Sequence, residues 1–314
     1  MKIGFIGLGN VGGKLAGSLL RNKVDLSVYD INKEALTKLS NKGARVVSSP
    51  KQLSEKVDCI ITCLPSPKIS AEVLESKEGI LNGIGSNKIW LEMSTTNEKE
   101  VLRLGRLIQG KGSKILDCPV SGGCHRADTG NISIFAGGDY DVFKLVLPYL
   151  SFMGRRILHT GRLGSASILK VMTNYLASVN LVSLGEALTV CKLAGLDMKT
   201  TYKAIKISSG NSFVNETETQ VILSGSYDVN FTMDLVLKDI GIFNSFSEEL
   251  KAPLEISPLL IKIFQEGRDK YGPEAWSTMI VKRLEDACNI NFRAKGFPDQ
   301  LVDDDPETLG YEIK

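Results

Sequence analysis

The chain has 314 residues, of which 43% are hydrophobic and 24% are charged, and its formal net charge is +2. This ordinary globular composition excludes a disordered or fibrous protein, and the small net charge favours neither a nucleic-acid partner nor an anionic membrane surface. At about 150 residues per domain, the length predicts two domains.

The six cysteines form no CxxC pair, and the chain holds two histidines, His125 and His159. A zinc site built from Cys and His is therefore not expected, and the chemistry inferred below requires no metal. A chain of this length can bury a large core without disulfides, so we expect reduced, mostly buried thiols in a cytoplasmic protein. No apolar run approaches the ~18 residues of a membrane-spanning helix. Residues 1–20 are not expected to be a signal peptide, because Lys14 and several glycines interrupt the apolar stretch.

From residue 1 to about residue 161, short apolar runs alternate with stretches of helical periodicity. The strand-like runs lie at 2–6, 26–29, 57–64, 89–93, 132–136 and 156–159. The helical stretches lie at 11–20, 33–40 and 98–109. Alternation of this kind predicts right-handed βαβ units and a parallel sheet.

After residue 164 the strand-like runs stop. Helices are predicted from apolar spacing at 165–193, 198–207, 233–250, 257–266 and 275–287. We therefore expect an α/β fold with a Rossmann-type dinucleotide-binding domain at 1–162 and an all-α domain at 163–314 for substrate binding and oligomerisation. A helical domain this apolar favours a homodimer or homotetramer. The acidic tail from Asp303 onward is expected to be loosely held.

A glycine-rich turn follows the first predicted strand and precedes a helix, with the sequence Gly7-Leu8-Gly9-Asn10-Val11-Gly12. This is the setting in which GxGxxG binds a dinucleotide. Gly7 allows the tight turn, Gly9 lets the backbone approach a pyrophosphate, and Gly12 lets the helix pack against the strand.

An acidic residue, Asp30, closes the second predicted strand. Its carboxylate can bind the two ribose hydroxyls of an adenosine and would repel a 2′-phosphate, which favours NAD over NADP. Lys33 weakens this preference, because a cation three residues further on could meet that phosphate, so NADP stays open as an alternative.

Five further segments carry a resemblance to one family, in order and spacing. They are Leu64-Pro65, Met93-Ser94-Thr95-Thr96, Asp117-Cys118-Pro119-Val120-Ser121-Gly122-Gly123, Gly161-x-x-Gly164 followed by Lys170-Val-Met-Thr-Asn174, and Lys238-Asp239. With the glycine-rich turn, they make the chain resemble the β-hydroxyacid dehydrogenases from end to end. That family includes the 3-hydroxyisobutyrate dehydrogenases.

The resemblance implies a site residue by residue. The family's cofactor-binding positions correspond here to Gly7, Gly9, Asn10, Val11, Gly12, Asp30, Leu64, Pro65, Thr95 and Lys238. Its substrate-binding positions correspond to Ser121, Gly122, Gly123 and Asn174, and its catalytic positions to Lys170 and Asn174. The implied reaction is reversible hydride transfer between a nicotinamide and a small 3-hydroxy carboxylic acid or semialdehyde. Substrates like 3-hydroxyisobutyrate, tartronate semialdehyde or succinic semialdehyde are all compatible with it.

The chemistry of these residues fits the implied roles. Ser121-Gly122-Gly123 offers a hydroxyl and successive unhindered backbone N–H groups, which suit a carboxylate. Lys170 and Asn174 are four residues apart and share a helix face. A lysine on an apolar helix is more often a surface residue, so it is the resemblance that assigns Lys170 the acid/base role. An ordinary lysine with a pKa near ~10.4 is a poor base at pH 7, so partial burial has to lower its pKa.

Two departures from the family pattern lie near these residues. Ala166 stands where the family usually has a second glycine after Gly164, and His125 and Arg126 follow the substrate signature where many members carry small residues. Arg126 could be a surface cation or could bind a second carboxylate, a phosphate or a polyhydroxylated chain. His125 is interpreted as a residue of the loop or pocket rim.

Two alternative functions are weighed against the dehydrogenase. One is a catalytically silent dinucleotide-binding protein that serves interactions, and the other is an imine reductase on the same fold. Lys170 and Asn174 argue against both, because relatives of these kinds are expected to lose or replace the lysine.

Overall fold

The computed structural model describes all 314 residues and divides into two compact units. Unit 1 comprises Met1–Lys170 together with Asp303–Lys314, and unit 2 comprises Val171–Val302. These units differ from the expected division at 162/163 in two places. The start of the long helix belongs with unit 1, and the C-terminal segment returns to unit 1.

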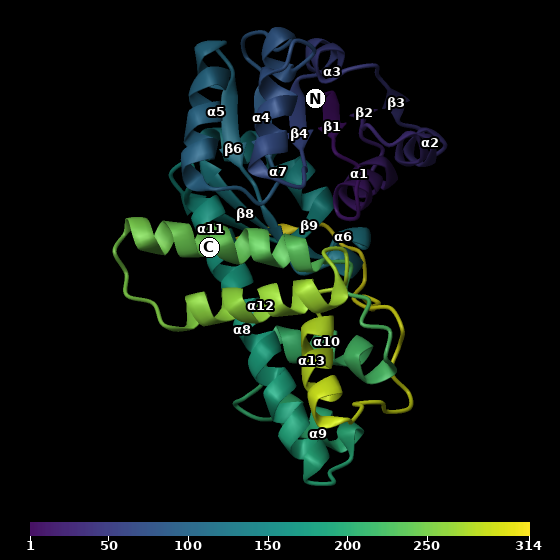
Figure 1. Ribbon diagram of the computed structural model, residues 1–314. Coiled ribbons are helices and arrows are strands. Elements are labelled where there is room, and N and C mark those ends of the chain that lie inside the picture. The colour runs from purple at the N-terminus through teal and green to yellow at the C-terminus, as the bar shows by residue number, and fades with distance from the viewer. The chain divides into compact units, whose positions relative to one another are not determined.

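Unit 1 is built on one ten-stranded sheet (Figure 1). Its first six strands are β1 (Ile3–Ile6), β2 (Leu26–Tyr29), β3 (Arg45–Val46), β4 (Cys59–Thr62), β5 (Ile89–Glu92) and β6 (Lys114–Asp117). They are parallel and adjacent in the order β3-β2-β1-β4-β5-β6. This is the strand order of the doubly wound dinucleotide-binding fold, so the predicted parallel sheet is confirmed.

Four further strands extend the sheet beyond β6. They are β7 (Val120–Ser121), β8 (Ile132–Gly138), β9 (Gly154–Gly161) and β10 (Tyr311–Ile313). β8 runs antiparallel to β6 and β7, whereas β9 is parallel to β8 and β10 is parallel to β9. The strands expected at 132–136 and 156–159 are therefore present.

Helices cover both faces of this sheet. They are α1 (Gly12–Arg21), α2 (Lys33–Ser40), α3 (Pro50–Lys56), α4 (Pro67–Glu75), α5 (Glu98–Gly110), α6 (Cys124–Asp128) and α7 (Tyr140–Met153), with the short 3₁₀-helix η1 (Ile80–Asn82). Side chains alternate along β1, so Phe5 belongs to the core on one face and Ile6 to the core on the other. Burial on both faces explains why these strands read as continuous apolar runs.

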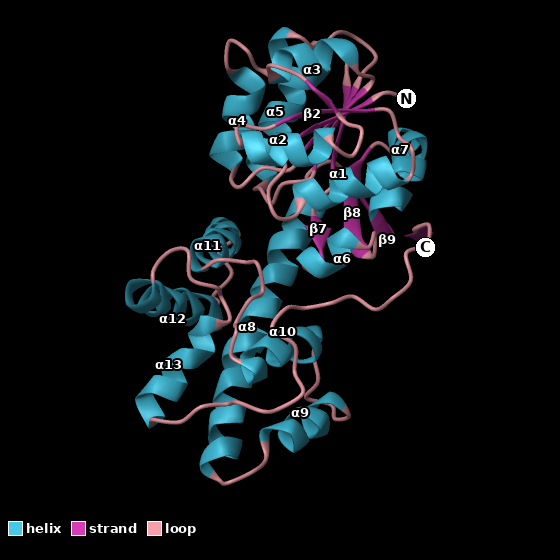
Figure 2. Cartoon of the chain, turned by 90° about the vertical axis from the view of Figure 1, so that its right-hand side faces the viewer, coloured by secondary structure: helices cyan, strands magenta, loops and turns pink.

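Unit 2 contains only helices and loops (Figure 2). It comprises most of α8 (Ser165–Leu193), and α9 (Met198–Lys206), α10 (Phe213–Ser224), α11 (Met233–Glu249), α12 (Ile256–Tyr271) and α13 (Met279–Cys288). The sequence did not predict α10. Its buried residues Val214 and Val221 are separated by Glu218, which interrupts the apolar stripe, although Ser212 provides a side-chain N-cap.

α8 has the bounds predicted from the sequence, 165–193, but it is more apolar than the expectation that no segment approaches a membrane-spanning helix allowed. Its best 18-residue window has a mean hydropathy of 1.3, so by length and composition alone this one helix could cross a membrane. A core helix of a soluble protein passes the same test, and Leu181, Leu184 and Leu188 of α8 are buried in the core of unit 2. The feature is therefore weak evidence for a membrane span.

The C-terminal tail was expected to be loosely held, and this expectation is wrong. The Asp303 side chain is only 4% exposed, and β10 adds a parallel strand to the open edge of β9. Pairing the backbone groups of an edge strand and burying a hydrogen-bonded carboxylate both fix the tail in place.

None of the six cysteines forms a disulfide, and Cys288 is the exposed one among them.

Candidate active site

The glycine-rich turn joins β1 to α1, and its three glycines differ in what surrounds them. Gly7 has a φ of +94°, and a Cβ there would lie 2.2 Å from the carbonyl oxygen of Cys63. A Cβ on Gly12 would lie 2.0 Å from the carbonyl oxygen of Gly7. Gly9 is exposed and has no atom within 4 Å of a Cβ position. The fold itself requires Gly7 and Gly12, whereas Gly9 keeps open the space that a ligand backbone contact needs.

Asp30 lies beside this turn at the end of β2. Its carboxylate accepts hydrogen bonds from the Leu8 N–H at 2.5 Å and from the Asn32 N–H at 2.7 Å. A carboxylate has about four acceptor positions, so Asp30 retains capacity for the hydroxyls of a ribose. Lys33, the first residue of α2, is exposed.

The loops after β4 and β5 carry Leu64, Pro65 and Thr95, and a hydrogen-bonded chain joins the two loops. The Leu64 N–H donates to Ser94 Oγ at 2.8 Å, and the Ser94 N–H donates to Glu92 Oε1 at 2.8 Å. Sequence reasoning gave Glu92 no role, although an acidic residue ending a buried strand was a visible signal.

Burial of Glu92 raises the pKa of its carboxyl group above the usual value, against the opposing hydrogen bonds from Ser94. Since the side chain is 1% exposed, its charged form has little access to solvent. The loop after β4 and the glycine-rich turn after β1 lie on either side of the point where the strand order reverses between β1 and β4, and the loop after β5 is next to the loop after β4. Ligands of open α/β sheets bind at such a point.

The segment expected to bind a substrate carboxylate begins on β7, where Ser121 pairs with Ser133 of β8. Gly122 and Gly123 follow with φ values of +130° and +87°, a conformation that L side chains rarely adopt. A Cβ on Gly123 would lie 2.9 Å from the His125 ring, which folds back toward this glycine. The two glycines thus present an open backbone that larger residues would close.

Asp117, at the end of β6, connects this segment to the helix that carries Lys170. Its carboxylate accepts hydrogen bonds from the N–H groups of Gly164 and Ser167 at 2.9 and 2.8 Å, and from Ser167 Oγ at 3.0 Å. Burial raises the pKa of Asp117, and these three donors oppose that rise. The start of α8 is thereby bound to the strand end from which the substrate segment departs. Lys170 lies one turn further along α8 and is 7% exposed.

Asn174 is one turn beyond Lys170 on α8 and belongs to unit 2. Its amide donates a hydrogen bond to the carboxylate of Asp239, and Lys238 Nζ lies 3.0 Å from the other oxygen of that carboxylate. Asp239 is 2% exposed, so the predicted residues Asn174 and Lys238 meet around a buried anion. The sequence offered Asp239 in the Lys238-Asp239 pair, but its role as the shared partner needed the fold.

The residues whose roles were left open have partners in unit 1. Arg126 lies 4.0 Å from a carboxylate oxygen of Asp303 and 3.9 Å from one of Asp305. Burial, together with the charge of Arg126, lowers the pKa of His125. His159 contacts the Gly138 carbonyl oxygen at 2.9 Å, which agrees with a structural role. The structure contains no group of three or more His, Cys, Asp or Glu that could hold a metal.

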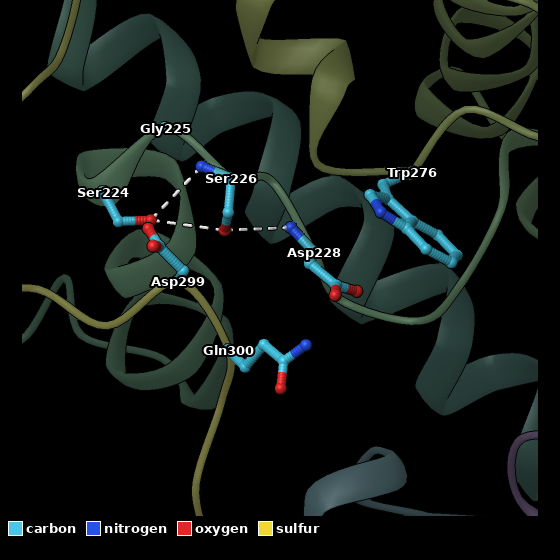
Figure 3. A pocket seen from close by; sticks show the side chains of 7 residues that line it. All are labelled: Ser224, Gly225, Ser226, Asp228, Trp276, Asp299 and Gln300. Carbon is cyan, nitrogen blue, oxygen red and sulfur yellow. Dashed lines mark hydrogen bonds between the residues drawn. The ribbon is translucent and has the colours of Figure 1, made fainter.

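An open pocket of about 500 Å³ lies in unit 2, and none of the residues that line it is a predicted site residue (Figure 3). It is lined by Ser224, Gly225, Ser226, Asp228, Trp276, Asp299 and Gln300. The Ser226 hydroxyl accepts from the Asp228 N–H at 3.3 Å, and Ser224 Oγ accepts from the Ser226 N–H at 3.2 Å. These polar groups stabilise the turn after α10.

Two family models match the sequence. The model described as the NAD binding domain of 6-phosphogluconate dehydrogenase matches residues 2–161. The model described as "NAD-binding of NADP-dependent 3-hydroxyisobutyrate dehydrogenase" matches residues 164–284.

Two of the relatives that match most of the chain are dehydrogenases of hydroxy acids. The 2-(hydroxymethyl)glutarate dehydrogenase of Eubacterium barkeri is 32% identical over 269 residues, covering 85% of this chain and 89% of that protein. The mitochondrial 3-hydroxyisobutyrate dehydrogenase of Mus musculus is 30% identical over 270 residues, covering 84% of this chain and 81% of that protein.

Solved structures share the fold. The 3-hydroxyisobutyrate dehydrogenase of Salmonella typhimurium has a TM-score of 0.83 at 22% identity, covering 90% of this chain and 99% of that chain. An imine reductase variant of Myxococcus stipitatus in complex with NAD⁺ is more distant. Its TM-score is 0.61 at 15% identity, with 90% and 98% of the two chains covered.

Proposed function

Because the chain belongs to the β-hydroxyacid dehydrogenase family and is an NAD(P)-dependent oxidoreductase of 3-hydroxy acids, we propose that Lys170 and Ser121-Gly122-Gly123 form its reaction centre. The observation that carries this assignment is the set of three hydrogen bonds at Asp117. They bind the start of the Lys170 helix to the strand end that precedes the substrate segment. A reacting hydroxyl and the carboxylate of the same small molecule need such a fixed separation between their binding groups.

The residues at the carboxyl ends of β1, β2, β4 and β5 suit a dinucleotide. The open backbone at Gly9 admits a pyrophosphate, and Asp30 accepts hydrogen bonds from ribose hydroxyls. Asn10, Val11 and Gly12 complete the phosphate-binding turn. The remaining proposed cofactor contacts are Leu64, Pro65, Thr95 and Lys238. When bound, a nicotinamide donates or accepts the hydride.

Substrate binding depends on the carboxylate. The Ser121 hydroxyl and the N–H groups of Gly122 and Gly123 donate hydrogen bonds to it, and charge-assisted bonds of this kind are about twice as strong as neutral ones. Lys170 Nζ takes the proton from the hydroxyl during oxidation and returns it to the carbonyl during reduction. Asn174, one turn further along α8, orients the substrate oxygen beside that amine. When protonated, Lys170 also stabilises the developing alkoxide.

The substrate class follows from the names of the relatives. 3-Hydroxyisobutyrate and 2-(hydroxymethyl)glutarate are both carboxylates whose α-carbon bears a hydroxymethyl group. We therefore propose an acid of this type, oxidised to its semialdehyde. The test is NAD(P)H absorbance at 340 nm with 3-hydroxyisobutyrate, 2-(hydroxymethyl)glutarate, glycerate and 4-hydroxybutyrate. Turnover confined to 4-hydroxybutyrate would contradict the proposed class in favour of a succinic-semialdehyde-like substrate.

NAD is proposed to bind more tightly than NADP, since the Asp30 carboxylate repels a 2′-phosphate. Fluorescence titration of both cofactors measures this difference. An equal or tighter affinity for NADP would show that Lys33 outweighs Asp30. The variant Asp30→Ala is expected to reduce the difference between the affinities for NAD and NADP, because it weakens the binding of NAD.

A homodimer or homotetramer is also proposed. The proposal is supported by exposed apolar side chains on α8, which are those of Met172, Leu176, Val190 and Leu193. A cytoplasmic location is proposed because six cysteines form no disulfide, as expected in a reducing compartment. Cell fractionation with an antibody against the protein measures its location.

A further inference from the structure

The C-terminal segment Asp303–Lys314 lies beyond both family models, which end at residue 284 or earlier. It nevertheless belongs to unit 1. Its last part forms β10 along β9, and the Gly310 N–H donates to the Ser151 carbonyl oxygen at 2.8 Å (Figure 2). The segment is therefore an anchored part of the unit that carries the substrate loop.

Asp303 makes the central contact of this segment. Its carboxylate accepts hydrogen bonds from Thr129 Oγ1 and from Asn131 Nδ2, the latter at 2.7 Å, and Arg126 faces its other oxygen. The Asn131 amide also donates to the Asp305 carbonyl oxygen at 3.0 Å. Burial opposes ionisation of Asp303, but the hydrogen bonds from Thr129 and Asn131 outweigh it and hold its pKa below the usual value.

A second connection runs through Glu307. Its carboxylate accepts hydrogen bonds from Arg21 of α1 at 3.0 and 3.1 Å. The same guanidinium donates to the Asp128 carbonyl oxygen, the last of α6, at 2.5 Å. A cation at the C-terminal end of a helix satisfies carbonyl groups that have no partner within the helix.

These contacts converge on the short stretch that contains the substrate loop. α6 begins directly after Gly123 and is followed by Thr129 and Asn131, after which β8 starts. The loop is held at its beginning by the pairing of Ser121 with β8. Its end is held by side chains of the C-terminal segment.

We propose that the C-terminal segment is a positioning element for substrate binding, in which Asp303 fixes α6 and so the open backbone of Gly122 and Gly123. The inference rests on the proposed function, since it gives that loop the task of binding a carboxylate. It also explains Arg126, whose cation faces carboxylates of the chain itself. Asp303 is here a positioning residue, because its own contacts are Arg126, Thr129 and Asn131.

The test compares Asp303→Ala with Asp304→Ala in the full-length protein. Asp304 is the adjacent, exposed aspartate, so the two variants remove the same charge at neighbouring positions. With 3-hydroxyisobutyrate as substrate, Asp303→Ala is expected to raise KM about tenfold, since hydrogen bonds to a charged group are lost. The kcat and the dissociation constant for NAD are expected to stay within about twofold, because neither depends on this loop holding a carboxylate. Asp303→Asn retains one acceptor oxygen and is expected to raise KM less, by about threefold.

Amide hydrogen exchange of residues 118–131, measured without substrate, provides a second readout. Asp303→Ala is expected to speed exchange there at least about tenfold over Asp304→Ala. Equal KM values and equal exchange rates in the two variants would overturn the inference. A lower kcat of Asp303→Ala with an unchanged KM would also overturn it, because that result indicates general destabilisation. If the wild-type protein oxidised no 3-hydroxy acid, the proposed substrate class would fail, while the exchange comparison would still decide whether the tail holds the loop.

Discussion

Lys170 is the residue on which the proposed chemistry depends most. Replacing it with alanine removes the proton carrier and the cation facing the alkoxide, so kcat is expected to fall by ~10²–10⁴-fold. Lys170→Arg is not expected to restore activity, because a guanidinium stays protonated. The measurement is kcat at saturating cofactor, with folding checked by circular dichroism. A folded Lys170→Ala enzyme that kept more than about a tenth of wild-type kcat would exclude the assigned role.

The buried carboxyl group of Glu92 predicts how the stability of the fold changes with pH. Its pKa is raised by burial, so between the unfolded and folded pKa values the unfolded state binds fewer protons, and rising pH lowers the stability of the fold. In this pH range the free energy of unfolding falls by up to about 1.4 kcal/mol per pH unit. Glu92→Gln keeps an acceptor for the Ser94 N–H and removes this titration. Its Tm, relative to wild type, is expected to increase as pH rises above about 4.5. A constant difference in Tm from pH 4 to 8 would contradict the idea.

The loop between β7 and α6 needs an open backbone for its proposed binding of a carboxylate. Gly123→Val places a β-branched side chain at a φ of +87° and against the His125 ring. The strain is expected to cost about 1–2 kcal/mol of stability. Carboxylate binding is expected to weaken so far that KM rises at least about tenfold, while NAD affinity stays unchanged. Titration of NAD by fluorescence and steady-state kinetics separate these effects. Weaker binding of both the substrate and NAD would instead indicate that unit 1 has unfolded.

The elements also differ in how far sequence could predict them. β1, β2, β4 and β5 were found because strands buried on both faces have continuous apolar sequences. In contrast, α10 was missed because Glu218 falls within its apolar stripe. Local patterns also missed the roles of Asp117 and Asp303, whose partners lie 47 or more residues away in the chain. Such contacts become visible only when the sheet order is known.

For the whole molecule, the exposed apolar residues of α8 predict self-association. Leu176→Glu places a charge on that face, and desolvating a charge in an apolar interface is costly. The expected result is a lower molar mass by light scattering at the same protein concentration, with the circular dichroism spectrum unchanged. The comparison for nonspecific effects is Lys203→Glu, a charge change at an exposed residue of α9. A wild-type protein that is monomeric at all concentrations would contradict the proposed oligomer.

The return of the last residues to unit 1 has a consequence for biosynthesis. β9 is complete once residue 161 has left the ribosome, but its partner β10 is translated only after all of unit 2. Throughout synthesis of unit 2, the edge of β9 is therefore an unpaired template that another nascent chain can occupy. Chains released early, before Tyr311, carry that edge permanently. The edge of β9 is thus closed to foreign strands only once β10 has been translated, so this late strand distinguishes chains that can complete the sheet from chains that cannot.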